Sequence, residues 1–359
     1  MKVRPAIADI APYIPGTTRG SAVKLSSNEN PFGPSPRVVE ALGSLASRVH
    51  VYPDPGANEL RSLLATRHSI RPEQIIVGNG SDEIMQIIAG TFLNSGETTL
   101  SSEHTFSQYK SVTQLFGGLY RETDMTDGRF DARALADAAR NDAPRIIWLC
   151  NPNNPTGTIL SHEDVRRVLD ASSSETVVVL DEAYADYADS PDFPDSRALI
   201  DEYPNLVVLR TFSKLFALAA LRVGYGFGHE DLIRRLYTIK QPFNVNTAAQ
   251  TAACAALGDT EHIRSSIQRN AEGRERMYTA FDRLGLAYYR SHGNFVAVHT
   301  PAPAVDIASS MMDAGVAVRA LTSFGMPDWI RITVGTQDHA TLVEQTLAAA
   351  LGQQARAVP

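Results

Sequence analysis

Three short apolar segments, each followed at once by polar residues, constrain the fold of this chain more than any other feature. They begin at residues 146, 177 and 206 and have the length and composition of buried strands. The polar side chains that follow them include Asn151, Asp181 and Lys214. Because parallel α/β sheets place functional groups at the carboxyl ends of their strands, we expect an amide, a carboxylate and an amine to meet at one edge of a sheet.

Lys214 is the residue on which the chemistry of this edge depends. A lysine after a strand is most often a solvated surface charge, but apolar residues flank Lys214 and Ser213 precedes it. Burial and a nearby cation such as Arg222 would keep its amine partly deprotonated, and such an amine can form a Schiff base. The guanidinium of Arg222 also suits bidentate binding of a phosphate group.

Asp181 and Tyr184 are interpreted together because they follow the same strand. An aspartate in this place often only caps a helix. The functional alternative is a buried carboxylate that pairs with a protonated pyridine nitrogen and makes the ring a better electron sink. Tyr184 could then donate to a phenolic oxygen on that ring, although its sequence position is equally typical of a core tyrosine.

The segment 151–157 contains two prolines and a glycine and is predicted to be a rigid turn. Asn151, directly after the strand, is the candidate for binding an oxygen of the ring or the imine. Asn153 and Asn154 are interpreted as structural parts of the turn.

A second glycine-containing turn, residues 78–82, joins a predicted strand to a helix that opens near Ser81. The free N–H groups at such a helix start can bind an anion, and Gly80 lets the backbone approach a phosphate closely. In the alternative interpretation Ser81 or Asp82 only caps the helix, and Asp82 and Glu83 would place two negative charges near the phosphate. The segment taken alone is compatible with either interpretation.

Composition narrows the class of protein. The formal charge of −7 and the absence of a basic run argue against a nucleic-acid-binding surface. Two cysteines fit a reducing compartment, and we expect a cytoplasmic location. Residues 1–15 lack the apolar stretch of a secretory signal, and no apolar run is long enough to span a bilayer, so no membrane partner is expected. No bound metal is expected either.

The chain is predicted to be organised in two domains preceded by an arm. Residues 1–35 are rich in Pro, Gly, Ser and Asn and are expected to form an extended arm that packs on the small domain. Residues 36–258, where strands alternate with amphipathic helices, predict a large domain with a mostly parallel sheet. Residues 259–359 predict a smaller α+β domain with helices at about 262–284 and 340–351.

Two local predictions complete the α/β assignment. Ser161-His-Glu-Asp164 has the pattern of a capping box that opens a helix. Residues 215–221 form the longest uninterrupted apolar run, and a helix is predicted there.

Taken together, these segments resemble the fold-type I pyridoxal-phosphate aminotransferases, in the branch that contains histidinol-phosphate aminotransferase. The matching motifs occur in the family's order and cover the chain almost from end to end. They are residues 25–33 (LSSNENPFG), 52–54 (YPD), 77–83 (VGNGSDE), 151–157 (NPNNPTG), 181–184 (DEAY), 211–222 (TFSKLFALAALR) and 330–335 (IRITVG). The resemblance implies a large domain with a mostly parallel sheet, a smaller α+β domain and pyridoxal 5′-phosphate as cofactor.

The resemblance also implies roles at the cofactor. Lys214 would bind the cofactor covalently and then move a proton at the substrate α-carbon, and Asp181 would pair with the pyridine nitrogen. Phe106 would stack on the ring, where the family frequently has a tyrosine. The ring oxygen would be bound by Asn151 and Tyr184. The phosphate would be held by Gly80, Ser81, Asp82, Ser213 and Arg222.

For the substrate, the resemblance implies that Arg331 clamps an α-carboxylate, because a bidentate fork suits that group. Arg319 would lie near the substrate's far end and meet a phosphate there, while Asn30 and Asn151 would also contact the substrate. Tyr52 would reach the cofactor phosphate of a neighbouring subunit, so a homodimer with shared sites is implied. One departure is Ala220, where the family often has glycine.

The activity expected first is transfer of the amino group of histidinol phosphate to 2-oxoglutarate, a step of histidine biosynthesis that gives imidazole acetol phosphate and glutamate. An aromatic amino-acid aminotransferase is the alternative, since Phe324 and Trp329 could form a more apolar pocket. A phospho-amino-acid decarboxylase shares the same cofactor machinery. A non-catalytic cofactor-binding sensor is disfavoured, because no DNA-binding motif precedes the fold and Lys214 and Asp181 are both present.

Overall fold

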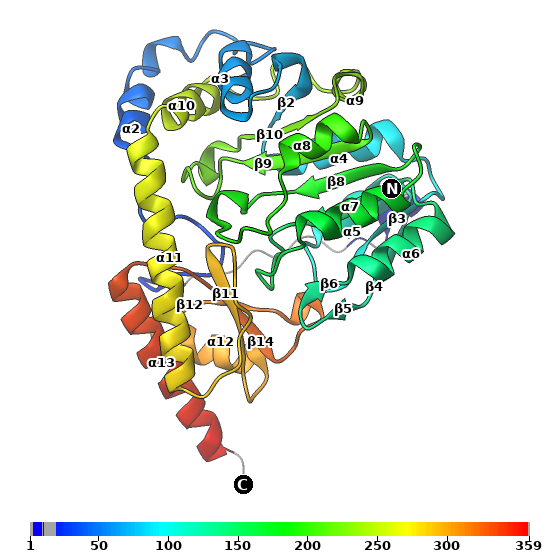
Figure 1. Cartoon of the computed structure of the whole chain (residues 1–359). Helices are drawn as coiled ribbons and strands as arrows, with labels where there is room; N and C mark the ends of the chain where they lie inside the picture. The colour runs from blue at the N-terminus through cyan, green and yellow to red at the C-terminus, as the bar shows by residue number, and fades with distance from the viewer. Residues whose placement is uncertain (1–2, 9, 11–18, 358–359) are drawn as a thin grey trace.

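A seven-stranded sheet forms the centre of the computed structural model, which describes residues 3–8, 10 and 19–357. The strand order is β2-β10-β9-β8-β7-β3-β4, and β10 runs antiparallel to both of its neighbours while the other pairs are parallel (Figure 1). The strands are β2 (Ile75–Gly78), β3 (Thr98–Ser102), β4 (Leu119–Thr123), β7 (Ile146–Cys150), β8 (Val177–Asp181), β9 (Leu206–Thr211) and β10 (Gly224–Gly228). The predicted α/β class with a mostly parallel sheet is confirmed.

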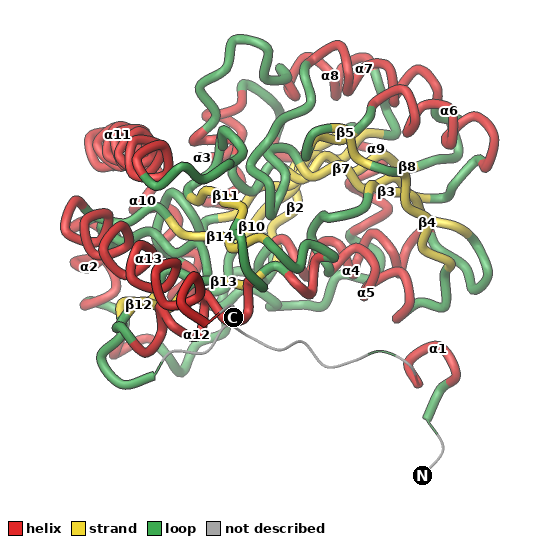
Figure 2. The backbone as a smooth tube through the Cα atoms, turned by 90° about the horizontal axis from the view of Figure 1, so that it is seen from below, coloured by secondary structure: helices red, strands yellow, loops and turns green. Residues whose placement is uncertain are grey.

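Helices cover both faces of this sheet, which is why its central strands are almost wholly apolar. In Figure 2 the helices α6 (Ala132–Asp142), α7 (His162–Ala171) and α8 (Ser196–Glu202) lie on one side of the strands. On the other side lie α4 (Ser81–Phe92) and α5 (Gln108–Leu115). All residues of β7 and β8 are buried, so the sheet fixes their carboxyl ends against movement.

The capping box predicted at the start of α7 is confirmed. Ser161 Oγ accepts a hydrogen bond from the backbone N–H of Asp164 at 3.1 Å, and Asp164 Oδ2 accepts one from the backbone N–H of Ser161 at 3.1 Å. This reciprocal pair satisfies two N–H groups that have no partner within the helix.

The helix predicted for residues 215–221 does not form. Turns follow Lys214, and only a short 3₁₀ helix, η4 (Ala219–Leu221), is present. Ala217 and Arg222 have φ values of 57° and 55°, so the chain bends out of helical geometry on both sides of that turn. Ala220 lies exposed within η4, away from the packed core.

A second hydrophobic core lies beyond the central sheet. It is built around the antiparallel sheet β11-β14-β13, with β11 at Phe295–His299, β14 at Trp329–Thr333 and β13 at Arg319–Ala320. The helices that pack around it are α11 (Thr260–Arg283), α12 (Ala304–Asp313) and α13 (Gln337–Ala357). In Figure 1 the long α11 runs from the helices α2 (Pro36–Gly43) and α10 (Thr247–Leu257) down to α13.

The N-terminal arm joins this second core. Its strand β1 (Val23–Lys24) pairs in parallel with β12 (Val316–Ala317), and the carbonyl oxygen of Leu25 accepts from the N–H of Thr333 at 2.8 Å. The predicted arm 1–35 and the predicted end of the second domain extend into residues 1–2, 9, 11–18 and 358–359, which lie outside the described residues. The domain boundaries at 35 and 258 stay predictions.

Two features are absent from the part of the chain that the structure describes. No helix there is both long and apolar enough to cross a membrane. Within the same residues, no group of three or more His, Cys, Asp or Glu side chains is placed to hold a metal ion.

Candidate active site

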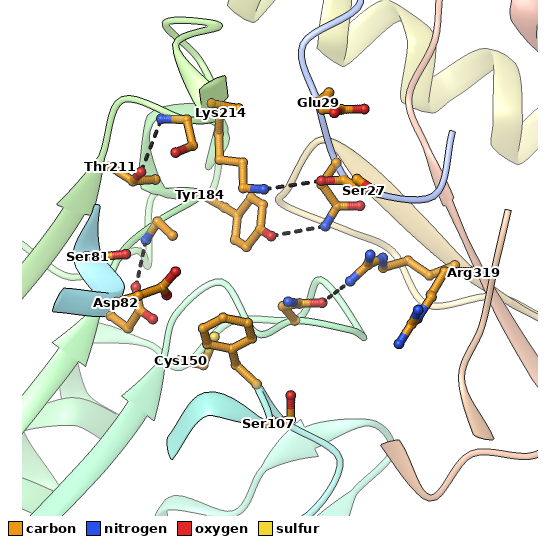
Figure 3. Close-up of a pocket in the computed structure, with 18 of the residues that line it drawn as sticks. Ser27, Glu29, Ser81, Asp82, Ser107, Cys150, Tyr184, Thr211, Lys214 and Arg319 are labelled. Carbon is orange, nitrogen blue, oxygen red and sulfur yellow. Dashed lines mark hydrogen bonds between the residues drawn. The ribbon is translucent and has the colours of Figure 1, made fainter. Parts of the chain in front are cut away.

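One cavity collects most of the predicted site residues. It opens at the carboxyl ends of β7, β8 and β9 and is closed on its other side by the arm and by β13 and β14 (Figure 3). Its walls include Ser81, Asp82, Phe106, Asp181, Tyr184, Ser213, Lys214, Arg222, Arg319 and Arg331. The register of the sheet explains part of this gathering, because Cys150 is paired with Asp181 and Asp181 with Leu209.

Lys214 projects into the middle of the cavity. Its Nζ donates to the carbonyl oxygen of Ser27 in the arm at 3.3 Å and lies 5.5 Å from the centre of the Tyr184 ring (Figure 3). Burial is the main cause that lowers the pKa of this amine to about 8, and the charge of Arg331 acts in the same direction. Arg222, expected to be the neighbouring cation, contributes less than Arg331 does. A substantial fraction of the amine is therefore neutral near pH 8.

Asp181 ends β8 as a buried carboxylate, with 3% of its surface exposed. Tyr109 Oη donates to its Oδ2 at 2.7 Å, and the backbone N–H of Ala183 donates to its Oδ1 at 3.2 Å. Burial raises the pKa of this carboxyl to about 6, and these two donors oppose the rise. Asp181 is therefore mostly ionised at neutral pH and can pair with a cation in the cavity.

Asn151 does not take the position predicted for it. Its Nδ2 donates to the carbonyl oxygen of Leu160 at 3.2 Å, its Oδ1 accepts from the N–H of Leu160 at 2.9 Å, and it is not part of the cavity wall. Because both polar atoms of the amide are engaged by buried backbone, Asn151 holds the turn together. Asn154, interpreted from the sequence as structural, lines the cavity instead and accepts a hydrogen bond from Arg331 Nη1.

One end of the cavity is suited to a phosphate. Ser81 begins α4, so the unpaired N–H groups at the start of this helix face the same region as the guanidinium of Arg222. Arg222 Nη1 lies 3.5 Å from Ser213 Oγ, which adds a hydroxyl. Gly80 has φ 82°, and a Cβ atom there would lie 2.8 Å from Arg222 Nη2, so a side chain would crowd the guanidinium.

The two acidic residues after Ser81 do not repel an anion as strongly as the sequence suggested. Glu83 Oε2 accepts from the N–H of Asn79 and from Asn244 Nδ2, each at 2.6 Å. Its charge is thereby directed to the outer side of the turn. Asp82 Oδ2 pairs with Arg222 Nη2 at 3.2 Å, and this pair keeps the guanidinium beside the helix start.

An aromatic and a phenol complete the cavity walls. Phe106 is half-buried and lines the cavity, as predicted for a ring that stacks on a planar ligand. Tyr184 Oη accepts a hydrogen bond from Asn28 Nδ2 at 3.0 Å (Figure 3). Burial raises the pKa of the Tyr184 phenol, so the group stays protonated and keeps a proton to donate.

Two arginines lie at the end of the cavity opposite Ser81 and Asp82; Figure 3 labels Arg319 there. Arg331 is buried and donates from Nη2 to the carbonyl oxygen of Ser26 at 2.9 Å. Arg319 is half-buried on the neighbouring strand, and its Nη2 lies 3.4 Å from Ser323 Oγ. A ligand with negative groups at both ends would fit between this pair and Arg222.

Two other predicted residues lie outside the cavity wall. Asn30 Nδ2 donates to the carbonyl oxygen of Leu215 at 2.8 Å, and its Oδ1 accepts from the N–H of Phe32, so it ties the arm to the turn after Lys214. Tyr52 has 79% of its surface exposed and stacks on Phe243 with ring centres 4.6 Å apart. Neither side chain contacts the cavity within one described subunit.

These groups fit a phosphorylated pyridine aldehyde. The amine can bind the aldehyde carbon, the ionised carboxylate can pair with a protonated ring nitrogen, and Phe106 offers a face on which a flat ring can stack. The glycine-lined helix start with Arg222 offers an anion site at one end.

Comparison with known proteins agrees with this arrangement. Residues 21–345 match the model of the family described as aminotransferase class I and II. The chain belongs to this family. The match spans all residues of the cavity wall and most of the two hydrophobic cores.

Individual relatives of this aminotransferase are also similar over almost their full lengths. The histidinol-phosphate aminotransferase of Halalkalibacterium halodurans is 41% identical over 347 residues, which cover 94% of each chain. That of Symbiobacterium thermophilum is 39% identical over 360 residues, covering 98% of this chain and 99% of the relative. The crystal structure of histidinol-phosphate aminotransferase from Sinorhizobium meliloti in complex with pyridoxal-5′-phosphate superposes with a TM-score of 0.90 at 28% identity, covering 100% of this chain and 98% of that one.

Several cavity residues of the aminotransferase were not predicted from the sequence. Cys150 is the last residue of β7 and faces the cavity, and the arm contributes Ser27. Alternation along β7 could have suggested Cys150. For Ser27, no local signal in the sequence indicates that its carbonyl oxygen lies beside the amine of Lys214.

Proposed function

We propose that this aminotransferase uses pyridoxal 5′-phosphate to transfer the amino group of histidinol phosphate to 2-oxoglutarate, giving imidazole acetol phosphate and glutamate. The full-length similarity to histidinol-phosphate aminotransferases supports this activity. The observation that carries the substrate assignment is the pair Arg319 and Arg331 on the wall opposite the phosphate end of the cavity.

At the cofactor, each residue has a distinct task. When bound, pyridoxal phosphate supplies an electron-accepting ring that stabilises negative charge at the substrate α-carbon. Asp181 would pair with the ring nitrogen, Asn154 and Tyr184 would bind the ring oxygen, and Phe106 would stack on the ring. Ser81, Ser213 and Arg222 hold the phosphate together with the backbone of Gly80 and Asp82.

Lys214 carries the proton. Its amine has a lowered pKa of about 8, so it can accept a proton from the α-carbon and return it without a large cost in either direction. Its Nζ is held near the arm by the carbonyl oxygen of Ser27, which keeps the amine over the centre of the cavity.

The two arginines accept both partners of the reaction. Histidinol phosphate carries its phosphate on the carbon next to the α-carbon, where an amino acid carries its carboxylate. Arg331 therefore meets the α-carboxylate of glutamate or 2-oxoglutarate, and with Arg319 it meets the phosphate of the donor. Two cations match the double charge of a phosphate better than one.

An aromatic amino-acid aminotransferase has less support. Phe324 lines the cavity, but Trp329 stacks on Tyr289 with ring centres 4.3 Å apart and does not belong to the cavity wall. Of the two aromatic residues expected to line an apolar substrate pocket, Phe324 therefore lines the cavity and Trp329 does not.

We further propose that the enzyme is a homodimer whose sites are shared. The ring of Tyr52 is exposed to solvent although it stacks on Phe243. The neighbouring Val49 and Val51 are also 80% and 57% exposed. An apolar patch of this kind is typical of a subunit interface. Tyr52 would reach the phosphate of the neighbouring subunit's cofactor, and a cytoplasmic location belongs to the same proposal.

A half-reaction tests the substrate. The purified enzyme loaded with pyridoxal phosphate is mixed with histidinol phosphate or with phenylalanine, and the absorbance spectrum of the cofactor is followed. We expect histidinol phosphate to convert the spectrum at a concentration at least about a hundredfold lower, since its phosphate engages Arg319 in addition to Arg331. Faster conversion by phenylalanine would make the chain an aromatic aminotransferase.

A further inference from the structure

Tyr109 lies in α5, behind the cavity wall, and contacts the carboxylate on which cofactor binding depends. Its side chain is fully buried, at 0% exposure, and its hydroxyl donates to Oδ2 of Asp181 at 2.7 Å. A phenylalanine would fill the same space. The hydroxyl therefore serves to donate to the charged carboxylate of Asp181. A buried hydroxyl without an acceptor would destabilise the fold.

The ring of Tyr109 is fixed on two sides. It stacks on Trp148 of β7 with ring centres 5.4 Å apart and planes inclined by 5°. It also packs edge-on against Phe106, with centres 5.6 Å apart and planes at 85°. Because aromatic contacts of both kinds are directional, the hydroxyl has little freedom to turn away from Asp181.

We propose that Tyr109 is a positioning residue that fixes two groups at once, the carboxylate of Asp181 at the edge of the bound pyridine ring and the stacking ring of Phe106 on its face. The proposal rests on pyridoxal phosphate being the cofactor. One side chain outside the cavity wall thereby holds two of the groups that would contact the ring.

The hydrogen bond also keeps Asp181 ionised. Burial raises the pKa of its carboxyl to about 6, and the Tyr109 hydroxyl is the strongest influence in the opposite direction. The negative charges of Asp82 and Glu182 act with burial to raise this pKa. The other titratable side chains that face Asp181 are Cys150 and Tyr184. Without Tyr109, the N–H of Ala183 would be the one donor to this carboxylate left among the described residues.

The test compares Tyr109→Phe with Tyr225→Phe. Tyr225 is a matched control, because it is also buried, and its hydroxyl lies 2.9 Å from His68 Nε2, outside the cavity wall. The affinity for pyridoxal phosphate is measured by absorbance titration between pH 5 and 8.5 in both variants and the wild type. The same two substitutions are then made in an Asp181→Asn background.

We expect Tyr109→Phe to weaken cofactor binding at pH 7 at least about tenfold, which corresponds to 1.4 kcal/mol. The acid-side fall of affinity should move upward by about one pH unit, because Asp181 becomes protonated more easily. In the Asp181→Asn background the loss should shrink to less than about threefold. An unshifted pH profile, or an equal loss in both backgrounds, would overturn the proposal.

A second measurement uses the cofactor-free protein. It tests the role of Tyr109 even if the wild type binds no pyridoxal phosphate. Failure of the wild type to bind pyridoxal phosphate would contradict the proposed function instead. Removing the donor costs most when Asp181 is ionised. The melting temperature of Tyr109→Phe relative to Tyr225→Phe should therefore fall by about 2 °C or more between pH 5 and pH 8. A constant difference across this range would show that Tyr109 does not act on the charge of Asp181.

Discussion

At the residue scale, the reactive amine is also a source of instability in the free protein. The pKa of Lys214 falls from 10.5 to about 8, so the unfolded chain binds more protons than the folded one between these pH values. Burial of Lys214 therefore lowers the free energy of unfolding most below pH 8. This cost disappears as the pH rises to 10.5. Reactivity and stability are opposed at this one side chain.

Substitution of Lys214 should separate these two effects. Lys214→Ala is expected to lower turnover by at least about a thousandfold, because the group that moves the proton is lost. The cofactor-free variant should be more stable than the wild type below pH 8, by at most about 3 kcal/mol at 1.36 kcal/mol per pKa unit. Urea unfolding across pH 7 to 10.5 measures the gain, which should vanish at the alkaline end. Exposed Lys110, replaced by alanine, serves as the control and should show no such trend.

The two asparagines of the 151–157 turn give a second residue-scale prediction. Asn154→Ala should weaken cofactor binding about tenfold, because one contact to the ring and the hydrogen bond that positions Arg331 are lost, and should cost less stability than Asn151→Ala, which leaves two backbone groups unpaired. Asn151→Ala should instead reduce the free energy of unfolding by about 2–4 kcal/mol, since both backbone groups of buried Leu160 lose their partner. Cofactor titration and chemical unfolding of both variants check this, and the reverse pattern would restore the original assignment of Asn151.

Arg319 tests substrate choice. Arg319→Ala should raise the KM for histidinol phosphate about 10- to 100-fold and leave the KM for phenylalanine nearly unchanged, since only the former carries a phosphate. Steady-state kinetics with both donors gives the ratio. Equal losses for the two donors would place Arg319 outside the phosphate pocket, whereas Arg331→Ala is expected to affect every anionic substrate.

At this scale, sequence reasoning identified the charged residues of the cavity but selected Asn151, whereas Asn154 is the asparagine that lines the cavity. Lys214, Asp181, Arg222 and Arg331 all line the cavity as predicted. Asp181 and Arg331 lie within strands, Lys214 comes shortly after β9, and Arg222 lies just before β10. The choice between Asn151 and Asn154 depends on how the turn folds back onto Leu160. That contact is tertiary and leaves no local pattern.

At the scale of elements, helix α7 gives a prediction that is independent of the site. Ser161→Ala removes the N-cap acceptor of this helix and should lower the free energy of unfolding by about 1 kcal/mol. The affinity for cofactor should stay as in the wild type. Ser62, whose hydroxyl donates to the carbonyl oxygen of Asn58 within α3 (Asn58–His68), is the control, and Ser62→Ala should be nearly neutral.

Elements were predictable where periodicity and burial agreed. The strands β7, β8 and β9 and the helix α4 occupy the residues expected of them, because buried parallel strands have an unbroken apolar pattern. Residues 215–221 have a similarly apolar pattern but form turns. There the backbone bends at Ala217 and Arg222 to bring the guanidinium beside α4, and this requirement overrides the helix preference of alanine and leucine.

At the scale of the whole molecule, the proposed dimer can be tested by complementation. Tyr52→Ala and Lys214→Ala subunits are inactive or weakened alone, but a mixed dimer contains one site with both residues intact. Random mixing in equal amounts should restore about a quarter of the wild-type activity, since half of the dimers are mixed and each has one intact site. The assay uses a cofactor concentration that saturates only the wild type. No recovery, with dimers verified by sedimentation, would place Tyr52 outside the shared site.

The pairing of β1 with β12 joins residues separated by nearly the whole chain, with Val23 opposite Val316. During synthesis the amino end leaves the ribosome long before its partner strand exists, and Arg331 is made later still. The large sheet can therefore fold before β1 pairs with β12, since contacts of such high sequence separation form late. A nascent chain stalled before residue 316 would hold the arm over Lys214 only through contacts with the large domain, such as those of Asn28 and Asn30. The cavity is complete only after Arg331 has been synthesised.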